Sequence, residues 1–98
     1  MKTMHFPKEY KKVLQRGRKN MTIRTHDEVG KYEKGQVYQA TDYRNNPLNI
    51  EIKILDVNRT IYKKIKKFLP KTDRKRLNLD DDAKVDVARF VPTNLPVR

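Results

Sequence analysis

The feature that most constrains the fold is the strand-like segment from Leu48 to Val57, in which apolar and polar side chains alternate strictly as far as Ile54. Successive side chains of a β-strand point to opposite faces, so alternation of this kind predicts a strand with one buried face. The apolar face would consist of Leu48, Ile50, Ile52 and Ile54, and the polar face of Asn49, Glu51 and Lys53. We therefore expect this segment to be the longest strand of the fold and one wall of a barrel.

Other segments supply partners for this strand. A second alternating run begins after Gly35 and leads into Tyr43–Pro47, which is rich in asparagine and ends in proline. Asparagine tolerates a positive φ and proline fixes φ, so this turn predicts a long antiparallel hairpin. The run from Ala83 to Val91 also alternates and predicts a closing strand. Shorter strands are expected at Met4–Phe6 and from Met21 to Arg24.

Two segments change from the strand period to the helix period. Apolar residues at helical spacing predict a first helix over residues 7–16, which Gly17 ends. A similar pattern from Arg59 to Leu69 predicts a second helix. The charged segment 71–82 is long for a connection, and we expect it to become ordered on binding. Residues 92–98 contain two prolines and predict an extended C-terminal arm.

Together these elements predict an α+β fold, a small mixed or antiparallel β-barrel with two helices, formed by residues 1–91. A chain of 98 residues forms one domain with a small core. No segment approaches the roughly 18 consecutive apolar residues of a membrane helix, and the first residues lack the apolar region of a signal peptide. The absence of cysteine excludes disulfides and cysteine-based zinc sites. We expect a cytoplasmic protein that does not contact membranes.

Net charge gives the strongest indication of function. The chain has 24 Lys and Arg residues against 12 Asp and Glu residues, a formal charge of +12 and an isoelectric point near 10.1. A charge of this size favours a polyanionic partner, and a basic domain is typical of nucleic-acid binders. The alternative is a lysine-rich surface that only keeps the protein soluble.

Many of the cations fall in one segment, where they can follow a phosphate backbone and release its counterions. This segment contains Lys63, Lys64, Lys66, Lys67, Lys71, Arg74, Lys75 and Arg76. Tyr32, Tyr38 and Tyr43 lie around the first hairpin and either stack on unpaired bases or belong to a half-buried wall of the barrel. The segment therefore predicts contacts to RNA phosphates.

A second cluster of cations surrounds the turn at Gly17 and comprises Arg16, Arg18, Lys19 and Arg24. The residues after the turn alternate like a strand, so Thr22 and Arg24 share a face, and Lys19 approaches them from the turn. A hydroxyl beside two cations can hold a phosphate, a carboxylate or the carbonyl of a base. We predict that this cluster binds RNA.

The spacing Gly17-x-Lys19-x-x-x-x-Arg24 resembles the signature of the ASCH domains, small β-barrels similar to the PUA domains that bind RNA. The order of His5-Phe6, this motif and the later run Tyr32–Tyr38 also resembles the family, over roughly residues 4 to 57. The resemblance implies a PUA-like fold and binding of structured RNA, such as ribosomal RNA or tRNA. The small size and basic composition add the hypothesis of a ribonucleoprotein component, for instance beside ribosomal proteins in the ribosome.

The resemblance also implies an alternative, catalytic function. In some ASCH enzymes the lysine and threonine of the motif act with a glutamate to hydrolyse the amide of N4-acetylcytidine, and the matching residues here are Lys19 and Thr22. Neighbouring cations lower the pKa of a lysine, which a base that activates threonine requires. No glutamate follows Glu51, however, so the sequence does not locate the acid. Two isolated histidines, His5 and His26, do not make a metal site, and we expect neither a metal nor a cofactor.

Overall fold

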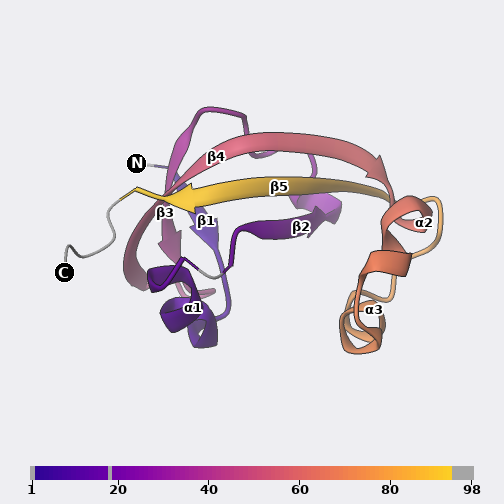
Figure 1. Ribbon diagram of the computed structural model, residues 1–98, viewed down its shortest axis with the longest axis horizontal. Coiled ribbons are helices and arrows are strands. Elements are labelled where there is room, and N and C mark those ends of the chain that lie inside the picture. The colour runs from indigo at the N-terminus through magenta and orange to yellow at the C-terminus, as the bar shows by residue number, and fades with distance from the viewer. Residues whose placement is uncertain (1, 18, 94–98) are drawn as a thin grey trace.

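The computed structural model describes residues 2–17 and 19–93 (Figure 1). Arg18, which we predicted to bind RNA, and residues 94–98 of the predicted C-terminal arm lie outside the described residues. The strands are β1 (Thr3–His5), β2 (Met21–Thr25), β3 (Val37–Thr41), β4 (Pro47–Ile61) and β5 (Lys84–Pro92). The helices are α1 (Lys11–Gln15), α2 (Tyr62–Ile65) and α3 (Lys71–Leu77), and the 3-10 turns are η1 (Lys8–Tyr10), η2 (His26–Glu28) and η3 (Lys66–Phe68).

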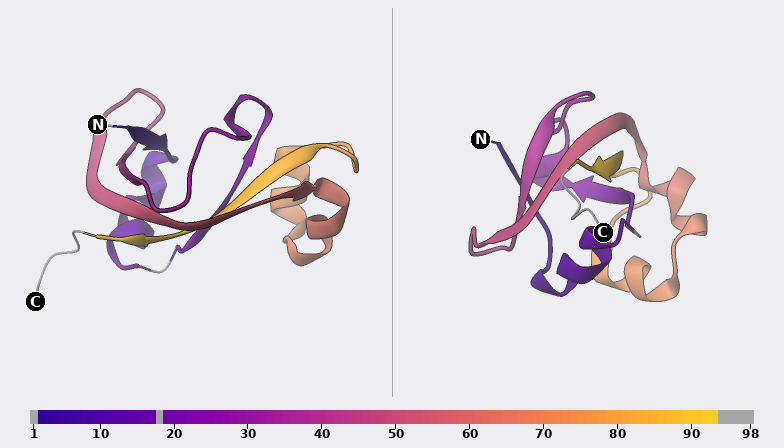
Figure 2. Two further views of the ribbon diagram at one scale, coloured as in Figure 1. Left: turned by 90° about the horizontal axis from the view of Figure 1, so that it is seen from above. Right: turned by 60° about the vertical axis from the view of Figure 1, so that its left-hand side comes forward.

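The five strands form one mixed sheet in the order β1-β3-β4-β5-β2. β1 pairs with β3 in parallel, and the other neighbours are antiparallel, including the predicted β3–β4 hairpin. The sheet is strongly twisted (Figure 2). Within the described part of the chain, no ladder joins the edge strands β1 and β2, so the sheet is open. The predicted α+β class is confirmed, whereas the closed barrel is not.

The core lies against the face of the sheet that the alternation predicted. The four apolar residues of β4 named above are buried, and Phe90 of β5 packs beside them. The predicted first helix is present as η1 followed by α1, and it buries Leu14 in the same core. Gly17, with φ of 68°, lies directly after this helix in the left-handed conformation that glycine adopts easily. The apolar pattern therefore identified the buried face correctly.

β4 is longer than predicted, and the second helix correspondingly begins later. We expected a helix from Arg59, but Arg59 pairs with Asp86 and Ile61 pairs with Lys84 in the β4–β5 ladder. The register shifts between Ile54 and Asp56, so one extra residue interrupts the alternation. This β-bulge explains why a period-2 pattern stops being recognisable before the strand ends.

The segment from Tyr62 to Ala83, here called the arm, lies at the far end of the β4–β5 ribbon (Figure 1). It contains α2, η3 and α3, so the prediction of an irregular connection over 71–82 is wrong for its first half. Pro70 precedes α3, and Asn78, with φ of 46°, ends it in the left-handed conformation that asparagine tolerates. α1 and the arm lie on the same side of the sheet at its opposite ends (Figure 1). Pro92, which we placed in the C-terminal arm, is the last residue of β5.

An ion pair between a buried carboxylate and a half-exposed arginine marks the root of the arm. The Asp86 side chain is fully buried, and its carboxylate accepts hydrogen bonds from Arg59 Nε at 2.9 Å and from the Gly30 N–H at 2.6 Å. Burial raises the pKa of Asp86, but these hydrogen bonds and the Arg59 charge lower it by more, so the net direction is downward. This contact ties the loop after η2 to both long strands where they leave the body of the sheet.

Candidate nucleic-acid site

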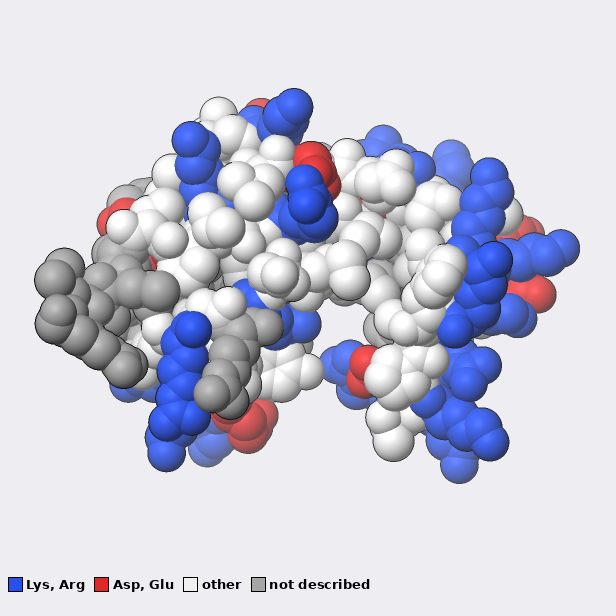
Figure 3. Space-filling view, in the orientation of Figure 1, with Lys and Arg blue, Asp and Glu red and all other residues white. Residues whose placement is uncertain are grey.

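A pocket of about 490 Å³ lies between the body of the sheet and the arm. The space-filling view shows the corresponding hollow below the sheet (Figure 3). β2 supplies one wall, the segment around η1 supplies the second, and α3 with the residues before it supplies the third. The polar and charged side chains around it include His5, Lys19, Thr22, Arg24, Glu28, Asp73 and Arg76, and the aromatic ones are Phe6, Tyr10, Tyr43 and Phe68.

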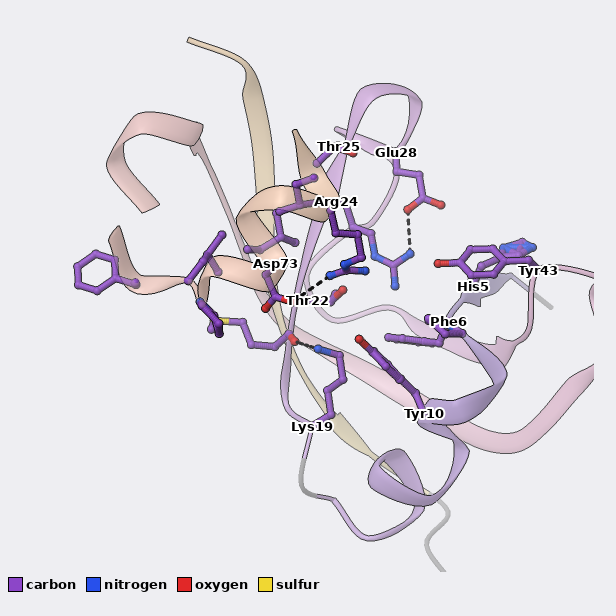
Figure 4. A pocket seen from close by; sticks show the side chains of 18 residues that line it. His5, Phe6, Tyr10, Lys19, Thr22, Arg24, Thr25, Glu28, Tyr43 and Asp73 are labelled. Atoms are coloured by element: carbon purple, nitrogen blue, oxygen red, sulfur yellow. Dashed lines mark hydrogen bonds and ion pairs between the residues drawn. The ribbon is translucent and has the colours of Figure 1, made fainter. Parts of the chain in front are cut away.

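The structure brings Lys19, Thr22 and Arg24 together in this pocket, as the strand alternation predicted (Figure 4). Lys19 Nζ donates a hydrogen bond to the backbone oxygen of Met21 at 2.8 Å and lies 5.3 Å from the centre of the Tyr10 ring. Burial lowers the pKa of Lys19, and the positive charge of Arg24 lowers it further. An amine held in this way donates hydrogen bonds to a ligand and loses its proton more easily than an exposed lysine.

Arg24 is buried among aromatic rings, which is unusual for a charged side chain. Its guanidinium carbon lies 4.8 Å from the centre of the Phe6 ring and 5.4 Å from that of Tyr32. Nη1 donates a hydrogen bond to Glu28 Oε2 at 2.8 Å. The sequence did not identify Glu28 as a partner of Arg24, although it lies four residues later. Glu28 reaches Arg24 because the 3-10 turn η2 follows the strand β2. The pair fixes the position of the guanidinium at the border of the pocket (Figure 4).

α3 contributes an acid and a base to the opposite wall. Asp73 and Arg76 line the pocket and form an ion pair of 3.6 Å with each other. Arg76 is the one member of the predicted arm cluster that also borders the pocket, whereas no spacing in the sequence distinguished Asp73 from the other aspartates after Glu51. Three basic and two acidic side chains therefore surround the cavity within the described residues, so its net charge is much smaller than the motif implied.

The acid that the catalytic alternative needs is not paired with Lys19. A catalytic pair requires hydrogen-bonding distance, about 3 Å between heavy atoms. Glu28 is bound to Arg24 and Asp73 to Arg76, and no ion pair among the described side chains includes Lys19. Asp73 acts on Lys19 only through its charge, which raises the pKa of the amine against the larger effect of burial.

The remaining predicted RNA-binding residues lie away from the pocket, mainly on the surface of the arm. Lys66 donates a hydrogen bond to Asp81 at 2.6 Å, so this cation is partly neutralised. Lys63, Lys64, Lys67, Lys71, Arg74 and Lys75 are exposed, and basic side chains cover much of the arm (Figure 3). Arg16 is exposed beyond the end of α1. The structure thus separates the predicted cations into a pocket group and a surface group.

The three tyrosines of the first hairpin have different environments. Tyr32 and Tyr38 are buried and pack edge to face, with ring centres 5.2 Å apart, so they belong to the core. Tyr43 is 67% exposed, and its ring lies nearly parallel to His5 with centres 6.3 Å apart. Tyr43 and His5 both border the pocket (Figure 4). Of these three tyrosines, Tyr43 is therefore the one that is placed to contact a ligand there.

Comparison with solved structures identifies the fold. The ASCH domain from Lactobacillus crispatus JV V101 superposes with a TM-score of 0.54 at 12% identity, covering 84% of this chain and 69% of that one. The chain has the ASCH fold. A DUF984 protein from Enterococcus faecalis V583 superposes with a TM-score of 0.61 at 14% identity, covering all of this chain and 84% of that one. At these identities the likeness concerns the ASCH fold alone. No family model matches the sequence, and no curated protein does.

Two further properties bear on the partners of this ASCH fold. Over the described residues, none of the helices is long and apolar enough to cross a membrane. In that same part of the chain, the histidines and acids do not gather in groups of three or more that could hold a metal ion.

Proposed function

We propose that this protein binds RNA, with the arm contacting backbone phosphates and the pocket receiving a nucleotide. The observation that supports this most is the position of the basic arm, which forms one wall of an aromatic-lined pocket. Exposed lysines and arginines supply affinity for phosphates through counterion release, and aromatic side chains supply stacking surfaces for unpaired bases. The ASCH fold is in keeping with this function, because PUA-like domains include RNA binders.

The RNA we propose is structured and cytoplasmic, with ribosomal RNA or tRNA as the candidates. A formal charge of +12 on 98 residues suits a permanent component of a ribonucleoprotein, in contact with ribosomal proteins as well as RNA. The arm projects from the sheet in a molecule 42 Å long, so it can reach into a groove or between helices of a folded RNA.

The direct test is purification of the protein from its native host at low salt, followed by sequencing of the RNA that accompanies it. We expect enrichment of one class of structured RNA and loss of this RNA when the preparation is repeated at high salt. Absence of RNA at low salt would contradict the proposal. Co-sedimentation with ribosomes tests the narrower ribosomal hypothesis, which fails if the protein stays in the soluble fraction while still carrying RNA.

A second candidate function is hydrolysis of N4-acetylcytidine, favoured by one observation. Lys19, whose pKa is lowered by burial, shares a pocket with Thr22. The expected result of an assay on the free nucleoside and on acetylated RNA would be release of acetate, lost in Lys19→Ala and in Thr22→Ala. The missing acid next to Lys19 speaks against this function, and no turnover on either substrate would eliminate it.

A further inference from the structure

Arg24 has hydrogen-bonding capacity that the protein itself does not use. The guanidinium offers five N–H donors, yet its side chain is only 7% exposed. Nη1 donates to Glu28, whereas Nε is buried without a partner, and no other hydrogen bond of this side chain occurs among the described residues. Buried charged groups normally have their donors satisfied, because an unpaired donor away from water is costly. Nε itself has almost no accessible surface, so a ligand in the pocket would accept from Nη2, which is not among the buried unpartnered atoms.

Figure 4 shows where such an acceptor would lie. The Arg24 guanidinium points into the pocket, near the Thr22 side chain and above the Phe6 ring. Phe6 is buried beneath the guanidinium, so the rings that a ligand can contact in this pocket are those of half-buried Tyr10 and exposed Tyr43. A flat ring with an acceptor atom at its edge fits this place, because its edge meets Arg24 while its face can contact an accessible tyrosine ring.

Glu28 restricts the charge of the group that Arg24 can accept. Its carboxylate is 2.8 Å from Nη1 and already balances the guanidinium, so this end of the pocket has no net charge. A phosphate at Arg24 would be brought close to a second anion at a site of reduced dielectric, where like charges repel strongly. A neutral group avoids this repulsion, and one that carries a donor beside its acceptor can also bond to the carboxylate.

We propose that Arg24 and Glu28 form a selective site for the edge of an unpaired nucleobase, and that phosphates stay outside it. The inference rests on the proposed function and specifies the ligand of the pocket. Base edges carry neighbouring acceptors and donors, and these are free only where the base is unpaired. Arg24 would donate to the acceptor, and Glu28 would accept from the donor. The phosphates would then lie nearer to Lys19 and the arm.

The test is an NMR titration of the ¹⁵N-labelled full chain, observed at the Arg24 Nε–H signal and assigned by its loss in Arg24→Lys. The probes are the four ribonucleosides, ribose 5-phosphate and inorganic phosphate, each added separately. At least one nucleoside should shift the signal, whereas ribose 5-phosphate and inorganic phosphate should leave it in place. In the Glu28→Gln variant, nucleoside affinity should fall about 10- to 100-fold, as for loss of one hydrogen bond to a charged group. The same variant should allow inorganic phosphate to shift the signal.

Asp56→Asn is the matched control, because it removes a carboxylate that pairs with Arg89 on the surface of the sheet, away from the pocket. This variant should retain the nucleoside affinity of the parent protein. The inference is overturned if inorganic phosphate shifts the Arg24 signal of the parent protein as strongly as any nucleoside does. It is also overturned if no nucleoside shifts the signal while the protein still binds RNA, a result that leaves the proposed function intact. If neither RNA nor any nucleoside binds, both are wrong.

Discussion

The pocket and the arm are two basic regions that differ in how their charges are held. In the pocket, Arg24 is buried and Lys19 is half-buried, and Glu28 and Asp73 lie among the basic residues. On the arm, most cations are exposed, and the segment contains eight basic residues and four acidic ones. Exposed cations attract any polyanion, whereas a buried and balanced pair distinguishes between ligands. Net charge alone therefore predicts well which ligands the arm attracts, and it predicts poorly which ligands the pocket selects.

The largest effect should come from breaking the ion pair at the root of the arm. Arg59→Ala leaves the fully buried Asp86 carboxylate without its ion-pair partner, and we expect a loss of about 3 kcal/mol in the free energy of unfolding. Urea denaturation measures this loss. Arg89→Ala removes an ion pair with Asp56 that is exposed on both sides, and its effect on the free energy of unfolding should be much smaller. Equal losses in the two variants would show that the pair with Asp86 does not hold the arm in place.

The ion pair of Arg59 with Asp86 also predicts how the free energy of unfolding depends on pH. The pKa of Asp86 is lower in the folded protein than its ordinary value of 3.8, so the unfolded chain binds more protons between these two values. The stabilisation is complete above 3.8 and is lost as the pH falls through the folded-state pKa. Acid titrations of stability should show this loss in the parent protein and a smaller one in Arg59→Ala. An unchanged acid profile in the variant would contradict the assignment.

Next in size is the effect of removing surface charge from the arm. The triple variant Lys63→Ala, Lys64→Ala, Lys67→Ala should weaken RNA binding about 50-fold at physiological salt and reduce the slope of log K against log salt by about 2, if each lysine neutralises one phosphate of a single strand. Affinity measured across a salt series checks both values. Lys8→Ala, Lys11→Ala, Lys12→Ala is a control of equal charge at the other end of the molecule. Equal slopes for the two triple variants would mean that the arm is not the phosphate-binding surface.

The smallest effect should be that of Lys19 on the free energy of unfolding, and it should occur only at alkaline pH. Its pKa is lowered from 10.5 in the folded protein, so the unfolded chain binds more protons between the lowered value and 10.5. Stability should therefore rise through this window as the pH increases, and Lys19→Met should abolish the rise. Lys12→Met, at an exposed position of α1, should retain it. An identical pH profile in parent and Lys19→Met would show that Lys19 is freely hydrated.

Much of the sheet followed from local pattern, because alternation reports directly which face of a strand is buried. The β3–β4 hairpin, β5 and the apolar face of β4 were all predictable in this way. The parallel pairing of β1 with β3 was not, since it depends on a distant segment. α3 was missed because its residues, which are good helix formers apart from Thr72 and Asp73, present no apolar stripe and none of them is buried.

The candidate site was predictable to the extent that it lies in one stretch of sequence. Lys19, Thr22 and Arg24 are separated by only a few residues, so strand geometry placed them together. Asp73 and Arg76 reach the same pocket because the arm folds back beside β2, and no local pattern reports that approach. The pairing that cancels the charge of Arg24 likewise depends on the backbone turning at η2. Composition therefore overestimated the positive charge of the pocket.

β4 passes from the centre of the sheet to the root of the arm as one strand of 15 residues. Because no flexible linker separates the pocket from the arm, a ligand held by one of them meets the other at an effective concentration fixed by the geometry of the fold. Two contacts that are weak when isolated then act together as one tight attachment. Each contact still forms and breaks independently, so an RNA bound at both places would be exchanged stepwise without being fully released.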